Sequence, residues 1–340
     1  MKQLKKTALN LAVVVVLATT GSSILFAGAN VQAAELSGEP QVRAFIDDMT
    51  RRHGFVEAEL EALVNEAKIL DSILKAISRP AEGKPWYAYR EIFLKPNRID
   101  GGAAFWDQHV QTLERAEEQF GVPAAVIVAI IGVETLYGEY RGKLRVLDAL
   151  ATLGFRYPKR SKFFTRELEH FLLLTREEGL DARSLTGSYA GAMGIPQFIP
   201  SSYRAYAVDF DGDNVRDLLG STEDAIGSVA SYLAEHGWRR GQPITVPAKV
   251  SGTAYKAFVE AGIKPEISVA RMQSNHVEVF EPLHADAKAA LLEFELRDGV
   301  EHWLGLKNFY VITRYNHSQL YAMAVFQLAE AIQALRDGAN

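Results

Sequence analysis

The 340-residue sequence contains no cysteine, so it forms no disulfide bond and offers no thiol for lipid attachment. Beyond the N-terminal region no apolar run is long enough to cross a membrane. No cluster of lysine and arginine is present, which argues against nucleic acid as a partner. The eight histidines lack the HExxH and H-x3-H spacings of zinc sites, and no G-x-S-x-G motif of serine hydrolases occurs. These absences exclude disulfide scaffolds, zinc enzymes and nucleic-acid binders.

The first 34 residues have the pattern of a cleavable secretory signal. Lys2, Lys5 and Lys6 precede an apolar stretch from Leu9 to Leu17, and small residues follow up to Ala34. A retained N-terminal anchor is the alternative interpretation. Removal of this segment takes away three lysines and no acidic residue, so the formal net charge changes from -5 to -8. We therefore expect a soluble, acidic protein of a bacterial periplasm, with no membrane span in the mature chain.

Hydrophobic periodicity predicts a helical domain over residues 35–104, with helices at 41–52 and 56–76. Pro85, Pro96 and the pair Gly101-Gly102 predict short irregular connections after these helices. A second block, residues 105–240, is expected to hold helices at 106–119, 144–153, 162–178 and 225–236.

The last hundred residues change in character. Segments rich in β-branched and aromatic residues predict a small strand-containing insert over residues 241–313, with strands near 244–251, 277–280, 289–296 and 308–313. Helical spacing returns at 318–334, with Ser318 as a possible N-cap and Gly338 beyond the end. Residues 314–340 are therefore expected to form a C-terminal helix that packs on the second block.

Glu134 stands in a run, Val122 to Gly138, that is otherwise almost free of polar side chains. A helix that is apolar on nearly every side belongs in a protein core. A carboxyl placed there is paired, bound to metal or kept protonated. A neutral carboxylic acid is the group that protonates a glycosidic oxygen. The alternative is a helix-terminal Glu that reaches water or a distant arginine.

A glycine-rich loop, residues 187–203, is the second signal. Gly187, Gly191 and Gly194 permit close backbone approach, and Pro196 and Pro200 stiffen the chain behind them. Such a loop presents the side chains of residues 188 and 197 to a polar ligand, unless its glycines serve chain geometry alone. The glycine spacing does not fit a phosphate-binding loop, and no organic cofactor is expected.

Three motifs in order resemble the B-type lytic transglycosylases of bacterial cell walls: Gly132-Val-Glu-Thr-Leu-Tyr-Gly138, Gly187-Ser-Tyr-Ala-Gly-Ala-Met-Gly-Ile-Pro-Gln-Phe198 and Tyr315-Asn316. The likeness extends over essentially the whole chain after the signal. It implies a mainly α (α+β) fold with a lysozyme-like catalytic core, a helical N-terminal domain and a small strand-containing insert. Because the lipidation cysteine is missing, the chain is similar to the soluble members of that group.

The resemblance implies an enzyme, a carbon–oxygen lyase that cleaves the β-1,4 bond between N-acetylmuramic acid and N-acetylglucosamine of peptidoglycan. The product carries a 1,6-anhydromuramic acid end. Glu134 matches the catalytic glutamate of the family. The substrate-binding residues implied are Ser188, Gln197, Tyr232, Tyr315 and Asn316, with Phe198, Arg160, Tyr89 and Tyr321 on shorter matches. The expected partner is the glycan strand of peptidoglycan.

Ordinary glycosidases place two carboxyl groups across the scissile bond. In this sequence only Glu134 has an apolar surround, since other acidic residues lie in charged helices or in an acidic loop. We therefore hypothesise a single carboxyl that is first acid and then base, with the acetamido and 6-hydroxyl groups of the sugar replacing the second carboxyl and water.

The acidic loop runs from Asp209 to Asp217. Asp209, Asp211 and Asp213, with the carbonyl of Val215, occupy positions 1, 3, 5 and 7 of an EF-hand-like loop. Position 6 is Asn rather than Gly, position 12 is Gly220, and Asp224 or Glu223 could supply the missing ligand. The alternative is an Asx-rich turn in which Ser221 and Asp224 form a capping box. The resemblance implies the same structural calcium site.

Two other functions fit these observations. One is a hydrolytic muramidase, in which water is the nucleophile. The other is a non-catalytic, calcium-stabilised peptidoglycan-binding protein, which would have little reason to bury Glu134.

Overall fold

The computed structural model describes residues 35–78 and 83–339, and the predicted signal, residues 1–34, lies outside them. As predicted, the described chain is mainly helical with one small sheet. It packs into two compact units, each built from two stretches of sequence. The units join residues 105–139 to the C-terminal region and residues 140–205 to the N-terminal helices. The predicted boundaries at residues 104, 240 and 313 stay a prediction.

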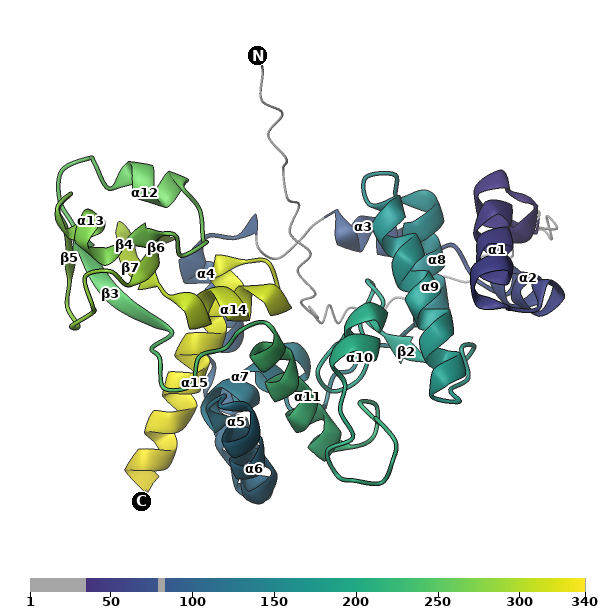
Figure 1. The fold of residues 1–340 in the computed structure, drawn as a ribbon, viewed down its shortest axis with the longest axis horizontal. Helices are drawn as coiled ribbons and strands as arrows, with labels where there is room; N and C mark the ends of the chain where they lie inside the picture. The colour runs from purple at the N-terminus through teal and green to yellow at the C-terminus, as the bar shows by residue number, and fades with distance from the viewer. Residues whose placement is uncertain (1–34, 79–82, 340) are drawn as a thin grey trace, which may run out of the picture. The chain divides into compact units, whose positions relative to one another are not determined.

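The first unit, residues 83–139 and 206–339, holds most of the elements (Figure 1). Its helices are α4 (Trp86–Phe93), α5 (Pro96–Gln108), α6 (Val110–Phe120), α7 (Ala124–Thr135), α11 (Thr222–Glu235), α12 (Lys256–Glu260), α13 (Val269–Gln273), α14 (Lys307–Tyr315) and α15 (Gln319–Ala339). Its strands are β3 (Thr245–Val250), β4 (Ile267–Ser268), β5 (Val277–Val279), β6 (Lys288–Glu295) and β7 (Val300–Gly305).

Helix α7 is the centre of this unit. All twelve of its residues are buried, because α5, α6, α11 and α15 pack around it. Figure 1 shows α5, α6 and α11 beside α7. Helix α15 begins with the hydroxyl of Ser318 accepting the amide of Tyr321 at 3.3 Å, so the predicted N-cap is confirmed. The helix continues through Gly338, which the sequence had placed beyond its end.

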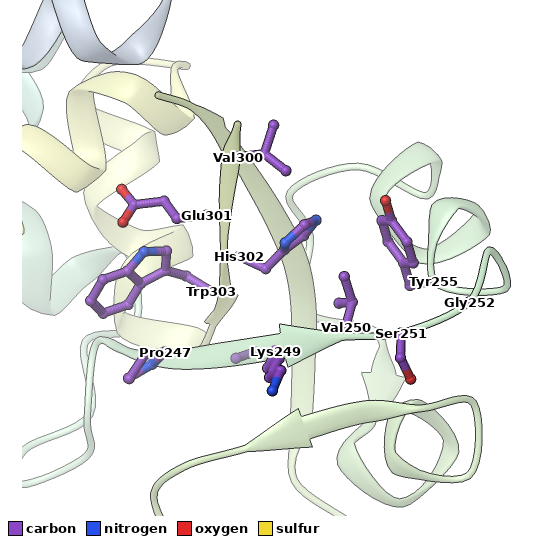
Figure 2. A pocket seen from close by; sticks show the side chains of 11 residues that line it. Pro247, Lys249, Val250, Ser251, Gly252, Tyr255, Val300, Glu301, His302 and Trp303 are labelled. Carbon is purple, nitrogen blue, oxygen red and sulfur yellow. The ribbon is translucent and has the colours of Figure 1, made fainter. Parts of the chain in front are cut away.

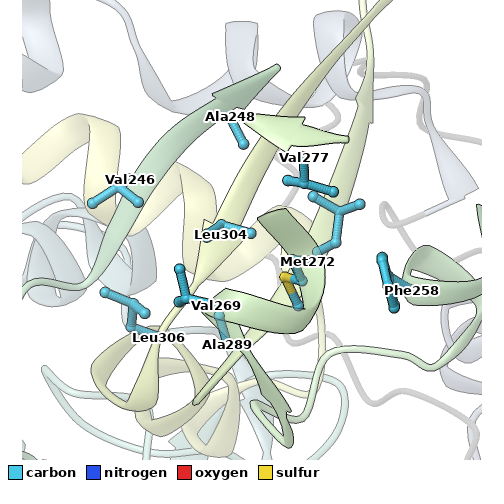
Figure 3. Close-up of a cluster of buried hydrophobic side chains, with 10 residues drawn as sticks. Val246, Ala248, Phe258, Val269, Met272, Val277, Ala289, Leu304 and Leu306 are labelled. Atoms are coloured by element: carbon cyan, nitrogen blue, oxygen red, sulfur yellow. The ribbon is translucent and has the colours of Figure 1, made fainter. Parts of the chain in front are cut away.

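The sheet has strand order β4-β6-β7-β3-β5, with antiparallel pairing throughout. One face carries a small hydrophobic cluster that joins the strands to α12 and α13 (Figure 3). Val246 and Leu304 come from the sheet, Phe258 comes from α12 and Met272 comes from α13. This cluster gives the insert its own core.

Strands β3 and β7 separate at one end of the sheet. Their pairing ends at Ala248 and His302, and a groove of about 490 Å³ opens beyond it (Figure 2). His302 lines the groove and is paired with Glu293 at 3.0 Å, and the Tyr255 ring lies edge-on to it at 5.1 Å. The groove is a consequence of strand divergence.

The second unit comprises residues 35–78 and 140–205. It holds a 3-10 helix η1 (Leu36–Gly38), α1 (Pro40–His53), α2 (Glu57–Asn65), α3 (Asp71–Ile77), β1 (Leu144–Arg145), α8 (Val146–Arg156), α9 (Ser161–Glu177), β2 (Thr186–Gly187) and α10 (Pro200–Tyr206). Helices α8 and α9 pack on each other and form its core. The strand pair β1–β2 ties the start of the glycine-rich loop to the start of α8.

Several local predictions were wrong. Gly101 and Gly102 lie inside α5 rather than in an irregular connection. Neighbouring side chains leave no room for a Cβ at these positions: one on Gly102 would lie 2.4 Å from Ile332 and 2.7 Å from the Tyr137 hydroxyl, and one on Gly101 would lie 3.0 Å from the Tyr137 ring. The predicted helix over residues 106–119 is also split at His109, between α5 and α6.

The segment 308–313, predicted as a strand, is part of α14. Its residues Asn308, Phe309, Val311 and Ile312 are buried at helical spacing, so burial decides against their β propensity. The strand that pairs with β6 is instead β7, residues 300–305, which the sequence analysis missed. This strand was not predicted because it begins with the more polar segment Val300-Glu-His-Trp, which lacks a run of β-branched residues.

Among the described residues, no single helix has both the length and the apolar composition of a membrane span. Helices α6 and α7 meet that test only when taken together, across a bend of 113°.

Candidate active site

Glu134 is the next-to-last residue of α7 and is 6% exposed, so the prediction of a buried carboxyl on a buried helix is confirmed. The helix ends at Thr135, after which Leu136, Tyr137 and Gly138 all adopt positive φ angles. The hydroxyl of Thr135 accepts the amide of Gly138 at 3.0 Å and closes this turn. Left-handed conformations at two consecutive non-glycine residues are uncommon and mark a position where the fold constrains the backbone.

Tyr321, on α15, donates its hydroxyl proton to Oε1 of Glu134 at 2.6 Å. The side chain of Tyr321 is fully buried. Burial and the neighbouring Glu134 raise the pKa of Tyr321 well above its ordinary value, so the phenol stays protonated and remains a donor. The pair therefore orients the carboxyl from inside the core.

Further tyrosines extend from this pair. The rings of Tyr321 and Tyr315 are near-parallel with centroids 6.4 Å apart, and Tyr232 meets Tyr315 at 4.9 Å. The hydroxyl of Tyr232 donates to the carbonyl of Arg314 at 2.6 Å, which ties α11 to the end of α14. Aromatic faces with polar tips are suited to sugar rings.

Two members of this aromatic group were missed from the sequence. Tyr206 lies 4.9 Å from Tyr232, and His236 stacks on Tyr232 at 4.1 Å. Burial lowers the pKa of His236, so its imidazole is held towards the neutral form. The available signal for His236 was its position one helical turn after Tyr232.

Asn316 follows α14 directly and is 4% exposed. Its Oδ1 atom is buried, and no hydrogen-bond donor reaches it from residues 35–78 and 83–339. A buried carbonyl oxygen without a donor is uncommon and needs an explanation.

Tyr89 does not fit its predicted role of direct sugar contact. Its side chain is fully buried in α4, between Trp86 at 6.4 Å and Phe93 at 5.2 Å. A ring without exposed surface has nothing to offer a sugar. The same holds for Tyr321, whose contact is Glu134. Both residues support the site from behind.

In the second unit, the glycine-rich loop presents Ser188 and Gln197 as buried polar residues. Oγ of Ser188 accepts the amides of Ala190 at 3.3 Å and Ala192 at 3.1 Å. Because a hydroxyl has two acceptor sites and one proton, these contacts leave the proton to be donated. The prediction of a stiff, hydrogen-bonded loop is consistent with this geometry.

Gln197 has a φ of 52°, the left-handed region. Its Nε2 donates to the carbonyls of Gly194 at 2.9 Å and Arg141 at 3.2 Å. Its Oε1 is buried without a donor among the residues that the structure describes. The side chain is thus fixed through its nitrogen and presents an unsatisfied acceptor.

Phe198 and Arg160 belong to the same unit. Phe198 is 2% exposed, and its backbone pairs with Met193. The Arg160 guanidinium lies over the Phe163 ring at 4.3 Å, and burial lowers its pKa. That these residues and Ser188 bind the same glycan as Glu134 stays a prediction.

The acidic loop brings Asp209, Asp211 and Asp213 together, each with a carboxylate oxygen within 4.8 Å of the others. Asp209 also accepts the amide of Gly212 at 2.7 Å and that of Asn214 at 2.8 Å, which closes the loop. Asn214 has a φ of 71°, so it takes the left-handed turn expected of it. Three exposed carboxylates at this spacing are a donor set that fits a hard cation such as Ca²⁺.

Asp224 lies outside this cluster, contrary to its predicted role as a ligand. It is fully buried, and its carboxylate accepts the amides of Phe210 at 2.6 Å, Asp211 at 3.2 Å and Asp217 at 2.7 Å. Its own amide donates to the Ser221 hydroxyl, the N-cap of α11, at 3.2 Å. Asp224 organises the backbone of the loop. The Val215 carbonyl remains a predicted ligand.

An apolar surround in the sequence singled out Glu134, but burial in the structure does not. Asp148, Glu167 and Asp224 are buried as well. Asp148 pairs with Arg145, and Glu167 accepts the amide and hydroxyl of Ser201 at 3.0 and 2.8 Å. Each of these three carboxyls thus has a partner in its own unit and a structural role.

Comparison with known proteins agrees with this geometry. The model of the transglycosylase SLT domain matches residues 37–330, and the chain belongs to this family. Over 312 residues it is 43% identical to the membrane-bound lytic murein transglycosylase B of Escherichia coli (strain K12), covering 89% of this chain and 85% of that protein. The chain is therefore a homologue of lytic murein transglycosylases, as its sequence motifs indicated.

Two solved structures support the fold. The soluble lytic transglycosylase SltB1 of Pseudomonas aeruginosa is 50% identical, with a TM-score of 0.83 over 88% of this chain and 100% of that chain. The Escherichia coli lytic transglycosylase Slt35, solved in complex with calcium, is 43% identical, with a TM-score of 0.80 over 88% and 94%. The predicted mainly α fold with a small sheet is confirmed.

Proposed function

We propose that this chain is a lytic transglycosylase that cleaves the β-1,4 bond between N-acetylmuramic acid and N-acetylglucosamine in peptidoglycan. Glu134 acts first as general acid and then as general base. The observation that carries the proposal is the buried Glu134 carboxyl, oriented by the Tyr321 hydroxyl at 2.6 Å in a chain of this family.

The chemistry proceeds in two steps. Glu134 donates its proton to the glycosidic oxygen, the bond from C1 to that oxygen breaks, and the muramyl acetamido group stabilises the positive charge at C1. The 6-hydroxyl of the same sugar then attacks C1, and its proton passes to the Glu134 carboxylate. The product is a 1,6-anhydromuramic acid end, Glu134 is again protonated, and no water is consumed. One carboxyl therefore serves both proton transfers.

Several polar side chains are suited to the contacts that such a substrate needs. The orphaned oxygens of Asn316 and Gln197 are acceptors for hydroxyl and acetamido N–H groups. The Ser188 hydroxyl is a donor, since its lone pairs are already occupied. Tyr315 and Tyr232 supply aromatic faces for sugar rings.

The test is incubation of purified sacculi with the wild-type chain and with Glu134→Gln, followed by mass spectrometry of the released fragments. Wild type releases anhydromuramic ends, and the variant releases almost none. Binding of sacculi by both proteins with release by neither would instead indicate a non-catalytic binding protein.

We further propose that Asp209, Asp211 and Asp213 hold a structural Ca²⁺ ion together with the Val215 carbonyl. The support is the carboxylate spacing within 4.8 Å and the calcium complex of the similar Slt35 structure. The ion offsets the repulsion among three like charges and stiffens the loop ahead of α11. It takes no part in the proton transfers.

We also propose that the mature chain works in the periplasm. The support is the signal-like pattern of residues 1–34 and the absence of a cysteine for lipid attachment, although the similar Escherichia coli protein is named membrane-bound. Fractionation of cells that express the full chain tests this. Recovery in the membrane fraction after a salt wash would contradict it.

A further inference from the structure

Arg98 occupies an unfavourable place in its own helix. Helix α5 begins at Pro96, so Arg98 lies in the first turn, where the helix dipole disfavours a cation. No acidic side chain offsets it in that turn. Burial lowers the pKa of Arg98, which adds to the cost of the charge. The position therefore requires a compensating partner elsewhere in the fold.

That partner is the C-terminal end of α7. Nη1 of Arg98 donates to the carbonyl of Gly132 and reaches the carbonyl of Val133 at 3.4 Å. The guanidinium also lies over the Phe93 ring, 5.3 Å from its centroid. The last carbonyls of a helix carry its partial negative charge, and a guanidinium there is favourable. The next residue in the chain is Glu134.

Tyr137, just after α7, makes a second hydrogen bond between the same two segments, this time with the donor on the α7 side. Its hydroxyl donates to the backbone carbonyl of Arg98 at 2.6 Å. Its ring occupies the space left by three glycines: a Cβ on Gly132 would lie 2.5 Å from the hydroxyl, and one on Gly101 would lie 3.0 Å from the ring. Burial raises the pKa of Tyr137, so this hydroxyl remains a donor. The start of α5 and the end of α7 thus hold each other.

We propose that Arg98 is a positioning residue for Glu134. It fixes the turn that carries the carboxyl, and its charge offsets the negative helix end, which keeps the carboxylate form of Glu134 accessible for the second proton transfer. The inference rests on the proposed function of Glu134. It explains why the first turn of α5 carries an arginine and why α5 contains two glycines.

The tyrosines that neighbouring helices bring towards Glu134 are neutral and carry no positive charge. Tyr321 on α15 and Tyr315 on α14 face Glu134 with raised pKa values and are neutral. Tyr232 on α11 lies next to Tyr315 and is neutral as well, since burial also raises its pKa. On α6, Glu117 accepts the amide of Ala124 at 2.9 Å, at the opposite end of α7.

The test compares Arg98→Met, Arg98→Lys and Tyr137→Phe with Arg240→Met as the matched control. Arg240 also donates to a last-turn helix carbonyl, that of Glu118 on α6, but away from Glu134. For each protein we measure the melting temperature, kcat and KM on sacculi, and the pH dependence of kcat.

We expect Arg98→Met to lower kcat on the order of 10²-fold, as for a small misplacement of a catalytic group, with little change in KM. Because the cation is lost, Glu134 keeps its proton to higher pH, so the alkaline limb of the pH profile, where this general acid ionises, moves to higher pH. Arg98→Lys keeps the charge and restores that limb, with only partial recovery of kcat. Arg240→Met keeps the wild-type kcat and profile per folded molecule.

The proposal is overturned if Arg98→Met, once corrected for the folded fraction, keeps the wild-type kcat and pH profile, or changes them no more than Arg240→Met does. If Arg98→Met does not fold, Arg98→Lys and Tyr137→Phe decide. An unchanged kcat in both would also refute it. Normal activity of Glu134→Gln would refute the proposed function itself, whereas an inactive Glu134→Gln beside a normal Arg98→Met refutes this inference alone.

Discussion

Helices α7 and α9 each bury a glutamate, and the two glutamates differ in what they contact. On α9, Glu167 accepts the backbone amide and the hydroxyl of Ser201, so its carboxyl serves the first turn of α10. On α7, Glu134 accepts a hydrogen bond from the hydroxyl of Tyr321, whose ring packs against a group of further tyrosines. Both carboxyls are buried, and their partners distinguish the structural carboxyl of Glu167 from the proposed catalytic carboxyl of Glu134.

The largest expected effect is the loss of activity when the Glu134 carboxyl is removed. Glu134→Gln removes the proton donor, and we expect kcat on sacculi to fall by about 10²–10⁴-fold or more. The melting temperature should change little. Glu167→Gln is the control, and it should keep near-normal turnover per folded molecule. Retained turnover in Glu134→Gln, or its loss in Glu167→Gln, would reverse the two assignments.

The next prediction compares two aspartates, Asp213 and Asp224, in their effect on stabilisation by calcium. At 100 times its Kd, Ca²⁺ should stabilise the folded chain by about 2.7 kcal/mol, seen as a rise in melting temperature. Asp213→Asn should lose most of this rise, because Asp213 belongs to the exposed cluster. Asp224→Asn should lower the melting temperature with or without calcium, since Asp224 accepts three backbone amides. A full calcium response in Asp213→Asn would contradict the site.

Tyr321→Phe tests the partner of Glu134 directly, because it removes only the hydroxyl that donates to this carboxyl. We expect kcat to fall by about ten- to a hundredfold, since one hydrogen bond to a charged group contributes about 1.5–3 kcal/mol. KM should change little, because Tyr321 is fully buried. Kinetics on sacculi check this, and a change confined to KM would argue for direct sugar contact instead.

The smallest expected effect is the pH dependence of the free energy of unfolding that Glu167 contributes. Burial raises the pKa of Glu167, so the folded state binds this proton more tightly than the unfolded state. The resulting stabilisation is complete below the unfolded pKa of about 4.3 and is lost as pH rises through the raised folded value. Glutamine does not titrate, so the stability gap between wild type and Glu167→Gln should be widest in acid and narrow towards neutral pH. Denaturant unfolding at several pH values measures it.

Glu134 could be predicted from the sequence because a single acid in an apolar run is visible along one helix. Burial of Glu167 could not, since α9 has a charged face and the burial of that carboxyl comes from packing between distant segments. Asp224 was assigned to the metal for a similar reason: spacing suggests ligands, but three backbone amides take its oxygens. Local pattern predicts which residues are reactive types, and tertiary contacts decide their partners.

The same limit explains the errors in the fold. Gly101 and Gly102 were interpreted as helix breakers, whereas Tyr137 and Ile332, which come from other segments, leave no room for a side chain at these positions of α5. Arg98 drew no attention, because its partners are backbone carbonyls of α7 that no side-chain motif reveals. The strand-like composition of residues 308–313 likewise gave way to burial in α14.

The most direct test of the central claim is digestion of sacculi by the wild-type chain in water labelled with heavy oxygen, followed by mass spectrometry of the muramic acid ends. If one carboxyl works with the sugar's own 6-hydroxyl, the new ends are anhydro sugars without the label. Labelled reducing ends would show that water attacks C1, and they would contradict the account.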